Sequence, residues 1–249
     1  MNYLDFARYY DELTENVDYP ARAEYLLNVM SYFQHAPGRV LDLACGTGSM
    51  TVELAKRGID IFGVDASGDM LTQAYDKAYD NDLELLFVRQ SMQALELPGL
   101  VDTVICTLDS VNHITSKKTL TRAFSRVSQY LADDGLFIFD ANTIYKHKVV
   151  LGDNCYIYDI ENVFCAWQNN YDPEDNRVVI TLDFFESQGD MYLRSTEQFS
   201  ERAYSREEMT EMLSAAGLEI TEVFGDMTLL PPSETEQREI YAVRKIRNE

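Results

Sequence analysis

The sequence is poor in the residues that hold metals or disulfides. Among 249 residues there are three histidines and four cysteines, and no two cysteines have the CxxC spacing of a zinc site. A scattered set of this kind favours reduced thiols over a disulfide framework. We therefore expect no structural metal and no disulfide.

Positive charge is also scarce. The chain has 21 Lys and Arg residues against 42 Asp and Glu residues, which gives a formal net charge of −21. Such a charge repels phosphate backbones and anionic lipid headgroups, and its simplest role is to keep the protein soluble. The composition predicts no nucleic-acid partner and no membrane partner.

Long apolar runs are missing as well. No run approaches the roughly 20 residues that a membrane span needs, and the opening residues lack the basic and apolar regions of a signal peptide. A cytoplasmic protein is expected, and the oligomeric state stays open. Hydrophobic residues still make up 46% of the chain, which is ample for a packed core.

Short β-branched runs alternate with helical stretches as far as residue 140, after a helical segment over residues 1–36. This alternation predicts an α/β fold of the Rossmann-like, doubly wound type, with a mostly parallel seven-stranded sheet. The expected strands are 39–43, 59–64, 84–88, 101–107 and 136–140, and the expected helices are 49–56, 68–79 and 117–131.

The pattern changes near residue 150. Three strand-like runs, 157–167, 178–186 and 191–199, follow one another without a helix, which predicts an antiparallel β meander. The core resumes with a helix at Ser205 and Glu208, which form a capping-box pattern, and ends in two antiparallel strands, 218–224 and 240–243. We expect residues 1–150 and 203–249 to form the core with an N-terminal helical lid. The insertion, 151–202, would cover the acceptor site, which is the place where a second substrate would bind beside the core's own ligand.

The most informative segment is the strand, glycine turn and helix start at residues 40–49. Gly46 and Gly48 let the backbone pass close to a ligand, and the helix that follows offers free N–H groups. Asp65 ends the second strand, where a carboxylate can accept both hydroxyls of a ribose. A dinucleotide fold for NAD shares this acid, but its third glycine is replaced here by Thr51.

This strand and loop resemble motif I of class I methyltransferases, which use S-adenosylmethionine and release S-adenosylhomocysteine. The resemblance implies Asp65 as the ribose acid and Met70 as a packing surface for adenine. Many members carry an acid where this chain has Ser91, so a backbone contact from Met92 would substitute. The implied donor-binding residues are Tyr10, Asp42, Ala44, Cys45, Gly46, Gly48, Asp65, Ala66, Met70, Gln90, Ser91, Met92, Leu108 and Asp109.

The segment 108–113 lacks the Asn/Asp-Pro-Pro-aromatic motif of nucleic-acid amino methyltransferases. The chain is instead similar to sugar and small-molecule N-methyltransferases, which implies in-line transfer to a small acceptor, with nitrogen slightly favoured over oxygen. The candidate catalytic residues are Tyr10, His113, Arg202 and Tyr204. Each has an ordinary alternative, either as a core aromatic or as a solvated polar group. A donor-binding protein without turnover and an NAD-dependent oxidoreductase also stay open.

Overall fold

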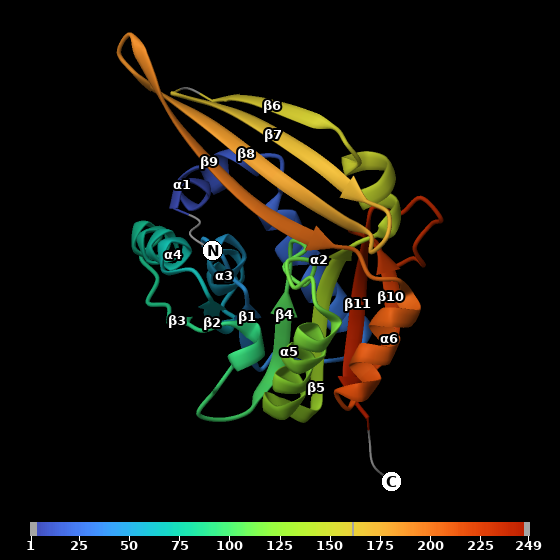
Figure 1. Cartoon of the computed structure of the whole chain (residues 1–249). Coiled ribbons are helices and arrows are strands. Elements are labelled where there is room, and N and C mark those ends of the chain that lie inside the picture. Colours follow the sequence, from blue (N-terminus) through green and yellow to red (C-terminus); the bar gives the residue numbers. More distant parts are fainter. Residues whose placement is uncertain (1–3, 161, 247–249) are drawn as a thin grey trace.

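The computed structural model describes residues 4–160 and 162–246. Figure 1 shows a central sheet flanked by helices, with a second, antiparallel sheet lying across one end of it. This arrangement confirms the predicted α/β fold with an added meander.

The central sheet has seven strands in the order β10-β11-β5-β4-β1-β2-β3. The first five strands of the chain are parallel to one another, while β11 is antiparallel to both β5 and β10. The seven strands are β1 (Arg39–Leu43), β2 (Asp60–Asp65), β3 (Phe87–Arg89), β4 (Val101–Cys106), β5 (Leu131–Asn142), β10 (Leu218–Gly225) and β11 (Arg238–Lys245).

Helices cover both faces of this sheet. Apolar residues of α2 and α3 pack on one face, and those of α5 and α6 pack on the other. The helical elements are α1 (Leu4–Leu13), α2 (Tyr19–Tyr32), α3 (Ser49–Lys56), α4 (Gly68–Asp80), η1 (Met92–Ala94), α5 (Lys117–Tyr130), η2 (Lys146–Leu151) and α6 (Arg206–Ala215). A sheet covered in this way has continuous apolar strands such as β1, whose last four residues are buried.

Local signals placed several boundaries correctly. Strand β1 and helix α3 have the predicted bounds, and the capping box of Ser205 and Glu208 starts α6. Strand β3 is shorter than predicted, and β5 is longer at both ends, because its start pairs with β4 at Val101 and its second half pairs with β11. The π-type turn η2 was not anticipated.

The meander has four strands, so the prediction of three is wrong. The run expected as one strand over 157–167 is a hairpin of β6 (Cys155–Ile160) and β7 (Val163–Asp172), which pair from Ile160 and Val163 outward. β8 (Arg177–Gln188) and β9 (Met191–Arg202) complete the sheet. No glycine or proline marks the first turn, and apolar residues continue on both sides of it. This left the sequence without a break signal there.

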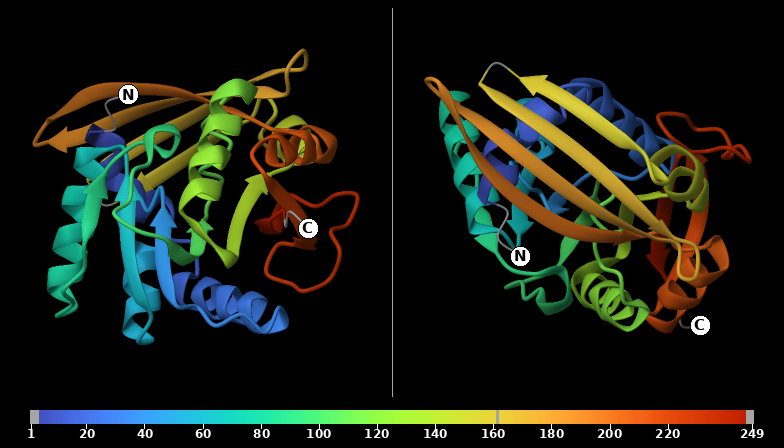
Figure 2. Two further views of the ribbon diagram at one scale, coloured as in Figure 1. Left: turned by 90° about the horizontal axis from the view of Figure 1, so that it is seen from below. Right: turned by 45° about the horizontal axis from the view of Figure 1, so that its top comes forward.

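The four-stranded sheet lies over the end of the core at which the parallel strands finish (Figures 1 and 2). Its inner face packs on Tyr9 and Leu13 of α1 and on Met70 of α4. At the far end of β9, Arg202 N–H donates to the carbonyl of Asn112, and Asn112 Nδ2 donates to the Arg202 carbonyl at 2.9 Å. The meander is thus fixed to the core at two places, by packing on α1 and α4 and by the hydrogen bonds between Arg202 and Asn112.

Across the described ranges 4–160 and 162–246, the helices are all too short or too polar to cross a membrane.

Candidate functional site

The glycine loop has the backbone conformation that the sequence predicted. Gly46 and Gly48 have φ angles of +54° and +74°, a region that side chains disfavour. A Cβ on Gly48 would meet the Ala74 side chain at 2.8 Å, whereas a Cβ on Gly46 would have no described atom within 4 Å. Gly48 is therefore needed for packing, and Gly46 faces open space in the cleft.

Asp65 joins the second strand to this loop. Its Oδ2 accepts a hydrogen bond from Gly46 N–H at 3.0 Å, and its Oδ1 accepts one from Ser67 N–H at 2.8 Å. Burial raises the pKa of the Asp65 carboxyl, and these N–H donors oppose the shift. A carboxylate offers about four lone-pair positions, so both oxygens keep capacity for ribose hydroxyls.

Asp42 lies beneath the loop and is only 1% exposed. Thr51, the residue that replaces the third glycine, donates its hydroxyl to Asp42 Oδ2 at 2.5 Å. Burial raises the pKa of Asp42 to about 7, against the opposing effect of the Thr51 hydrogen bond. A carboxyl with such a pKa is readily ionised by a cationic ligand placed beside it.

The raised pKa of Asp42 predicts a stability that falls with pH. The folded state holds the proton more tightly than the unfolded state, so the stabilisation is complete at acidic pH and is lost as pH rises towards 7. Between pH 5 and 8 we expect the wild type to lose about 3 kcal/mol more free energy of unfolding than Asp42→Asn, whose amide mimics the protonated acid. Urea unfolding of both proteins at several pH values measures this difference. Parallel curves for the two proteins would contradict it.

The cleft over the glycine loop is closed from above by the N-terminal helices. The residues that line it are Tyr10, Tyr19, Asp42, Ala44, Cys45, Gly46, Thr47, Ser49, Met50, Thr107, Leu108 and Ser110. Burial raises the pKa of the Tyr10 hydroxyl well above its usual value and raises that of Tyr19 as well. Both tyrosines therefore face the cleft as neutral phenols.

Asp11 ties α1 to the loop. Thr47 Oγ1 donates to Asp11 Oδ1 at 2.7 Å, and the Lys77 ammonium of α4 donates to Asp11 Oδ2 at 2.6 Å. Lys77 also donates to the hydroxyls of Thr47 and Ser49. This cluster fixes the first helix over the cleft from outside.

The residues predicted to bind the adenine end of the donor make contacts with other parts of the chain. The Ala66 carbonyl accepts from Arg89 Nε at 3.2 Å. Gln90 uses its side-chain amide on the backbone of Glu96, accepting from its N–H at 2.7 Å and donating to its carbonyl at 3.0 Å. Met70 is buried against the meander cluster, Met92 is partly buried against the main core, and Ser91 begins η1 without a side-chain cap bond. The donor contacts predicted for these residues stay predictions.

The loop after β4 is held by a buried carboxylate. The N–H groups of Leu108 and Asp109, both at positive φ, donate to the two oxygens of Asp140 at 2.7 and 2.6 Å. Arg238 bridges Asp109 and Asp140 at 2.7 and 2.8 Å. Coulombic attraction to Arg238 holds the pKa of Asp109 well below its usual value even though burial opposes it.

The predicted acceptor-side residues fall into two groups. His113 is partly buried, and its Nε2 lies 3.7 Å from the buried Glu201 carboxylate. Arg202 instead donates to Glu208 Oε1 at 3.3 Å and stacks on Tyr204, and the Tyr204 hydroxyl donates to the carbonyl of Ile114. These contacts join β9 to α6 and to the loop before α5, so they do not favour the pocket role predicted for Arg202 and Tyr204. The side chains of β9 that are buried against the core are Phe199 and Glu201, on the opposite face of the strand.

Several residues of the site carried no local signal. Each is polar and is brought to the cleft by an element distant in sequence from its partner, as Arg238 is to Asp109. Of these residues, only Asp140 could have been found from the sequence, because it is an acid at the end of a strand that the sequence predicted. The residues not anticipated are Asp11, Tyr19, Asp140, Glu201 and Arg238.

The cleft suits the donor that the sequence resemblance implies. Open space lies at Gly46, a strand-end carboxylate with spare acceptor capacity lies beside it, and an ionisable acid lies below. Together these features fit a backbone-cradled cationic nucleoside. The walls carry hydroxyl groups from Thr47, Ser49 and Ser110, so the cleft is not an apolar plug.

Comparisons with known proteins agree with this site. A family model described as a methyltransferase domain matches residues 40–135. The chain is 30% identical, over 98% of both lengths, to YqeM of Bacillus subtilis (strain 168), whose name places it with the methyltransferases and states no acceptor.

Solved structures extend the likeness over nearly the whole chain. A crystal structure of an S-adenosylmethionine-dependent methyltransferase from Clostridium acetobutylicum ATCC 824 matches with a TM-score of 0.87 and 32% identity over 98% of both chains. The sugar N-methyltransferase KedS8 from Streptoalloteichus sp ATCC 53650 matches with a TM-score of 0.76 and 20% identity, over 95% of this chain and 92% of that one. At that identity the second likeness concerns the fold alone.

Proposed function

This chain belongs to the S-adenosylmethionine-dependent methyltransferases, and we propose that its methyl acceptor is a small molecule that reacts through nitrogen. The observation that carries the proposal is the small covered cleft beside Leu108, which the donor loop, Tyr10 of α1 and Tyr19 of α2 enclose. An enclosure of this kind suits an acceptor that can be surrounded.

The donor would lie along the glycine loop. We assign its ribose hydroxyls to Asp65 and its backbone approach to Ala44, Cys45, Gly46 and Gly48. S-adenosylmethionine supplies an activated methyl group on a sulfonium when it is bound. Asp42, whose pKa of about 7 responds to nearby positive charge, would be ionised by the cationic donor.

The protein's contribution to the reaction is mainly alignment. In-line displacement needs the acceptor lone pair about 3 Å from the methyl carbon, and correct orientation can supply roughly 7–11 kcal/mol of the barrier. Tyr10 and Tyr19 enclose the cleft as neutral phenols, and the meander packs on Tyr9 and Leu13 of the same first helix. Residues 151–202 would thus act as the cover of the acceptor site and α1 as a lid.

Two features favour nitrogen over oxygen. His113, in the loop after β4 and beside Glu201, would take the proton that an ammonium must lose before it attacks. The sugar N-methyltransferase KedS8 shares the fold, and the match covers 95% of this chain and so includes most of the meander. An acceptor-contact role for Arg202 and Tyr204 stays a prediction that their observed contacts do not favour.

Family membership also bears on the alternatives. The alternative of an NAD-dependent oxidoreductase is not supported, because the family's donor is S-adenosylmethionine. A cleft plugged by apolar side chains would favour a donor-binding protein without turnover, whereas this cleft is lined in part by the hydroxyls of Thr47, Ser49 and Ser110. A cytoplasmic location and the absence of a nucleic-acid partner stay predictions that rest on charge and composition.

A labelling experiment tests the acceptor class. The purified enzyme is incubated with S-adenosylmethionine labelled in the methyl group and with a size-fractionated extract of bacterial cells. We expect carbon-13 label in the small-molecule fraction, in a base-stable product whose methyl carbon has the NMR chemical shift of an N-methyl rather than an O-methyl group, and none with Asp65→Ala. Label in the protein or RNA fraction, or a base-labile methyl ester, would overturn the proposal.

A further inference from the structure

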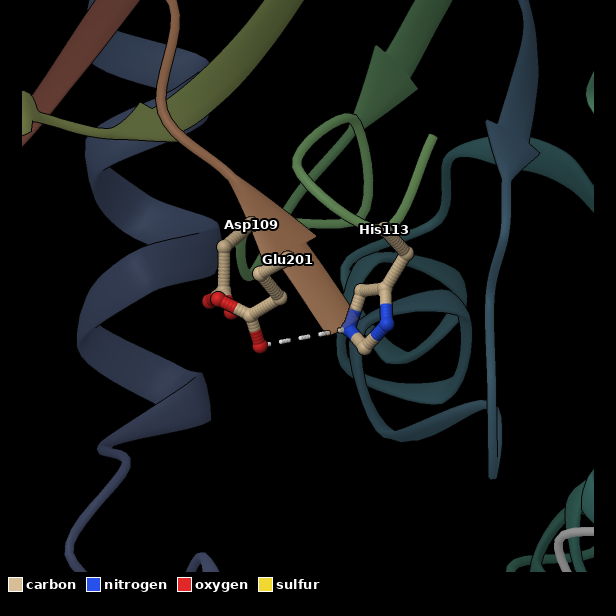
Figure 3. A group of neighbouring side chains, drawn as sticks. All are labelled: Asp109, His113 and Glu201. Atoms are coloured by element: carbon tan, nitrogen blue, oxygen red, sulfur yellow. Dashed lines mark ion pairs between the residues drawn. The ribbon is translucent and has the colours of Figure 1, made fainter. Parts of the chain in front are cut away.

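Three hydrogen-bond acceptors converge outside the donor loop, where the segment after β4 meets β9. Asp109 and His113 come from that segment and Glu201 comes from the strand (Figure 3). One atom of each lies within 4.8 Å of the others. His113 Nε2 is 3.7 Å from Glu201 Oε1, which is longer than a hydrogen bond. A small donor placed between these atoms would meet three acceptors at once.

Glu201 is the least expected member of the group. Its side chain is buried, and a buried carboxylate is costly unless it is paired. Oε2 accepts from Asn142 Nδ2 at 3.3 Å, whereas Oε1 makes no hydrogen bond within the described part of the chain. One oxygen is therefore held by the protein, and the other is directed to the gap between Glu201 and His113.

His147 supports Glu201 from behind. It is fully buried, with Nδ1 3.1 Å from the Asn176 carbonyl and Nε2 3.5 Å from Glu201 Oε2. A carbonyl only accepts, so Nδ1 carries a hydrogen, and Nε2 bonds to Glu201 only when a proton lies between them. Because His147 Nε2 has no hydrogen-bond partner among the described residues, His147 holds the Glu201 carboxylate by close packing and is a positioning residue.

We propose that Asp109, His113 and Glu201 bind the ammonium group of the acceptor, and we call these three residues the ammonium cradle. The inference rests on the proposed function, because it takes the acceptor atom to be nitrogen. A primary ammonium has three N–H bonds, which match two carboxylates and one neutral imidazole nitrogen. The chemistry identifies a primary or secondary amine as the acceptor class.

The charges around the cradle favour an ammonium over a divalent metal ion. Arg238 already bridges Asp109 and Asp140, and the Lys146 ammonium donates to Asn142 Oδ1 at 2.9 Å, next to Glu201. A dication would meet both of these positive groups as well as the donor's sulfonium. A monocation meets less repulsion, and it loses its charge when it gives up its proton.

The cradle also accounts for the proton. An ammonium has no lone pair, so it first transfers one proton to His113 Nε2. This step uses the tautomer with hydrogen on Nδ1, a buried atom that has no hydrogen-bond partner among the described residues. The nitrogen lone pair then forms a bond to the methyl carbon while the carbon–sulfur bond breaks and its electron pair stays on sulfur. The products are S-adenosylhomocysteine and an N-methylated ammonium, and His113 releases its proton to solvent.

Because the chain has only three histidines, NMR of the labelled imidazoles tests the cradle directly. The protein is saturated with S-adenosylhomocysteine and titrated with methylammonium chloride, and with tetramethylammonium chloride at the same ionic strength. We expect a saturable shift of the His113 signal with methylammonium alone, while His35 stays unchanged. Glu201→Gln should weaken methylammonium binding about tenfold or more, and the exposed Glu211→Gln should not.

Several outcomes overturn the cradle. These are a His113 signal that does not move, one that moves equally with tetramethylammonium, or unchanged binding in Glu201→Gln. Selective broadening of the His113 signal by micromolar Mn²⁺, lost in Glu201→Gln, would assign a metal site instead. Unchanged S-adenosylhomocysteine affinity shows that each variant is folded. Failure of the proposed function is separate, because it would appear as label in macromolecules whatever the His113 signal does.

Discussion

Replacing Asp65 with alanine should weaken the binding of S-adenosylhomocysteine about a hundredfold or more. The carboxylate has spare acceptor positions for two ribose hydroxyls, and each hydrogen bond to a charged group is worth about 1.5–3 kcal/mol. The same change frees the N–H groups of Gly46 and Ser67, so the loop itself also loses its fixed shape. Isothermal titration calorimetry measures the dissociation constant directly.

Two further variants separate these contributions. Asp65→Asn keeps one oxygen for a backbone N–H but loses the charge, so its affinity should lie between those of the wild type and Asp65→Ala. Asp60→Ala removes an exposed acid at the start of the same strand and should bind as the wild type does. If Asp65→Ala bound as tightly as Asp60→Ala, the ribose assignment would be wrong.

The donor half of the site was predictable because its signals are local. The strand, the glycine turn and the next helix occupy consecutive residues, and Asp65 ends the neighbouring parallel strand, whose end must lie at the same edge of the sheet. Thr51 was noticed only as a missing glycine, yet its hydroxyl bonds to Asp42. Local sequence thus located the acid without showing its buried partner.

The acceptor half was not predictable in the same way. His113 and Glu201 are 88 residues apart in sequence, and their meeting depends on how the end of β9 is tied to Asn112. Strand periodicity placed Arg202 and Tyr204 on one strand face, but β9 ends at Arg202 and Tyr204 is buried in the main core. Periodicity also could not say which face of β9 meets the core. The register of β9 against the core decides that, and it favours the face that carries Phe199 and Glu201.

Alanine at Gly48 should cause the larger loss of stability, whereas alanine at Gly46 should mainly weaken donor binding. Both positions have positive φ, so alanine costs about 1–2 kcal/mol of backbone strain at either one. At Gly48 the new Cβ would also lie 2.8 Å from the Ala74 side chain, and overpacking of this kind costs about 1–3 kcal/mol more. At Gly46 the Cβ enters open cleft space, where it would meet the ligand instead. Gly46→Ala should therefore lose S-adenosylhomocysteine affinity about tenfold or more with the smaller loss of stability.

Gly58→Ala provides the matched control for this comparison. Gly58 has a φ of +80° and open space around its Cβ position, but it follows α3 at the end away from the cleft. Its loss of free energy of unfolding, measured in urea, should equal that of Gly46→Ala, since both report backbone strain alone, while its donor affinity stays at the wild-type value. Gly48→Ala should be less stable than either. A Gly46→Ala protein that binds as tightly as Gly58→Ala would show that the donor does not pass over Gly46, because only the position of the added methyl group differs between the two.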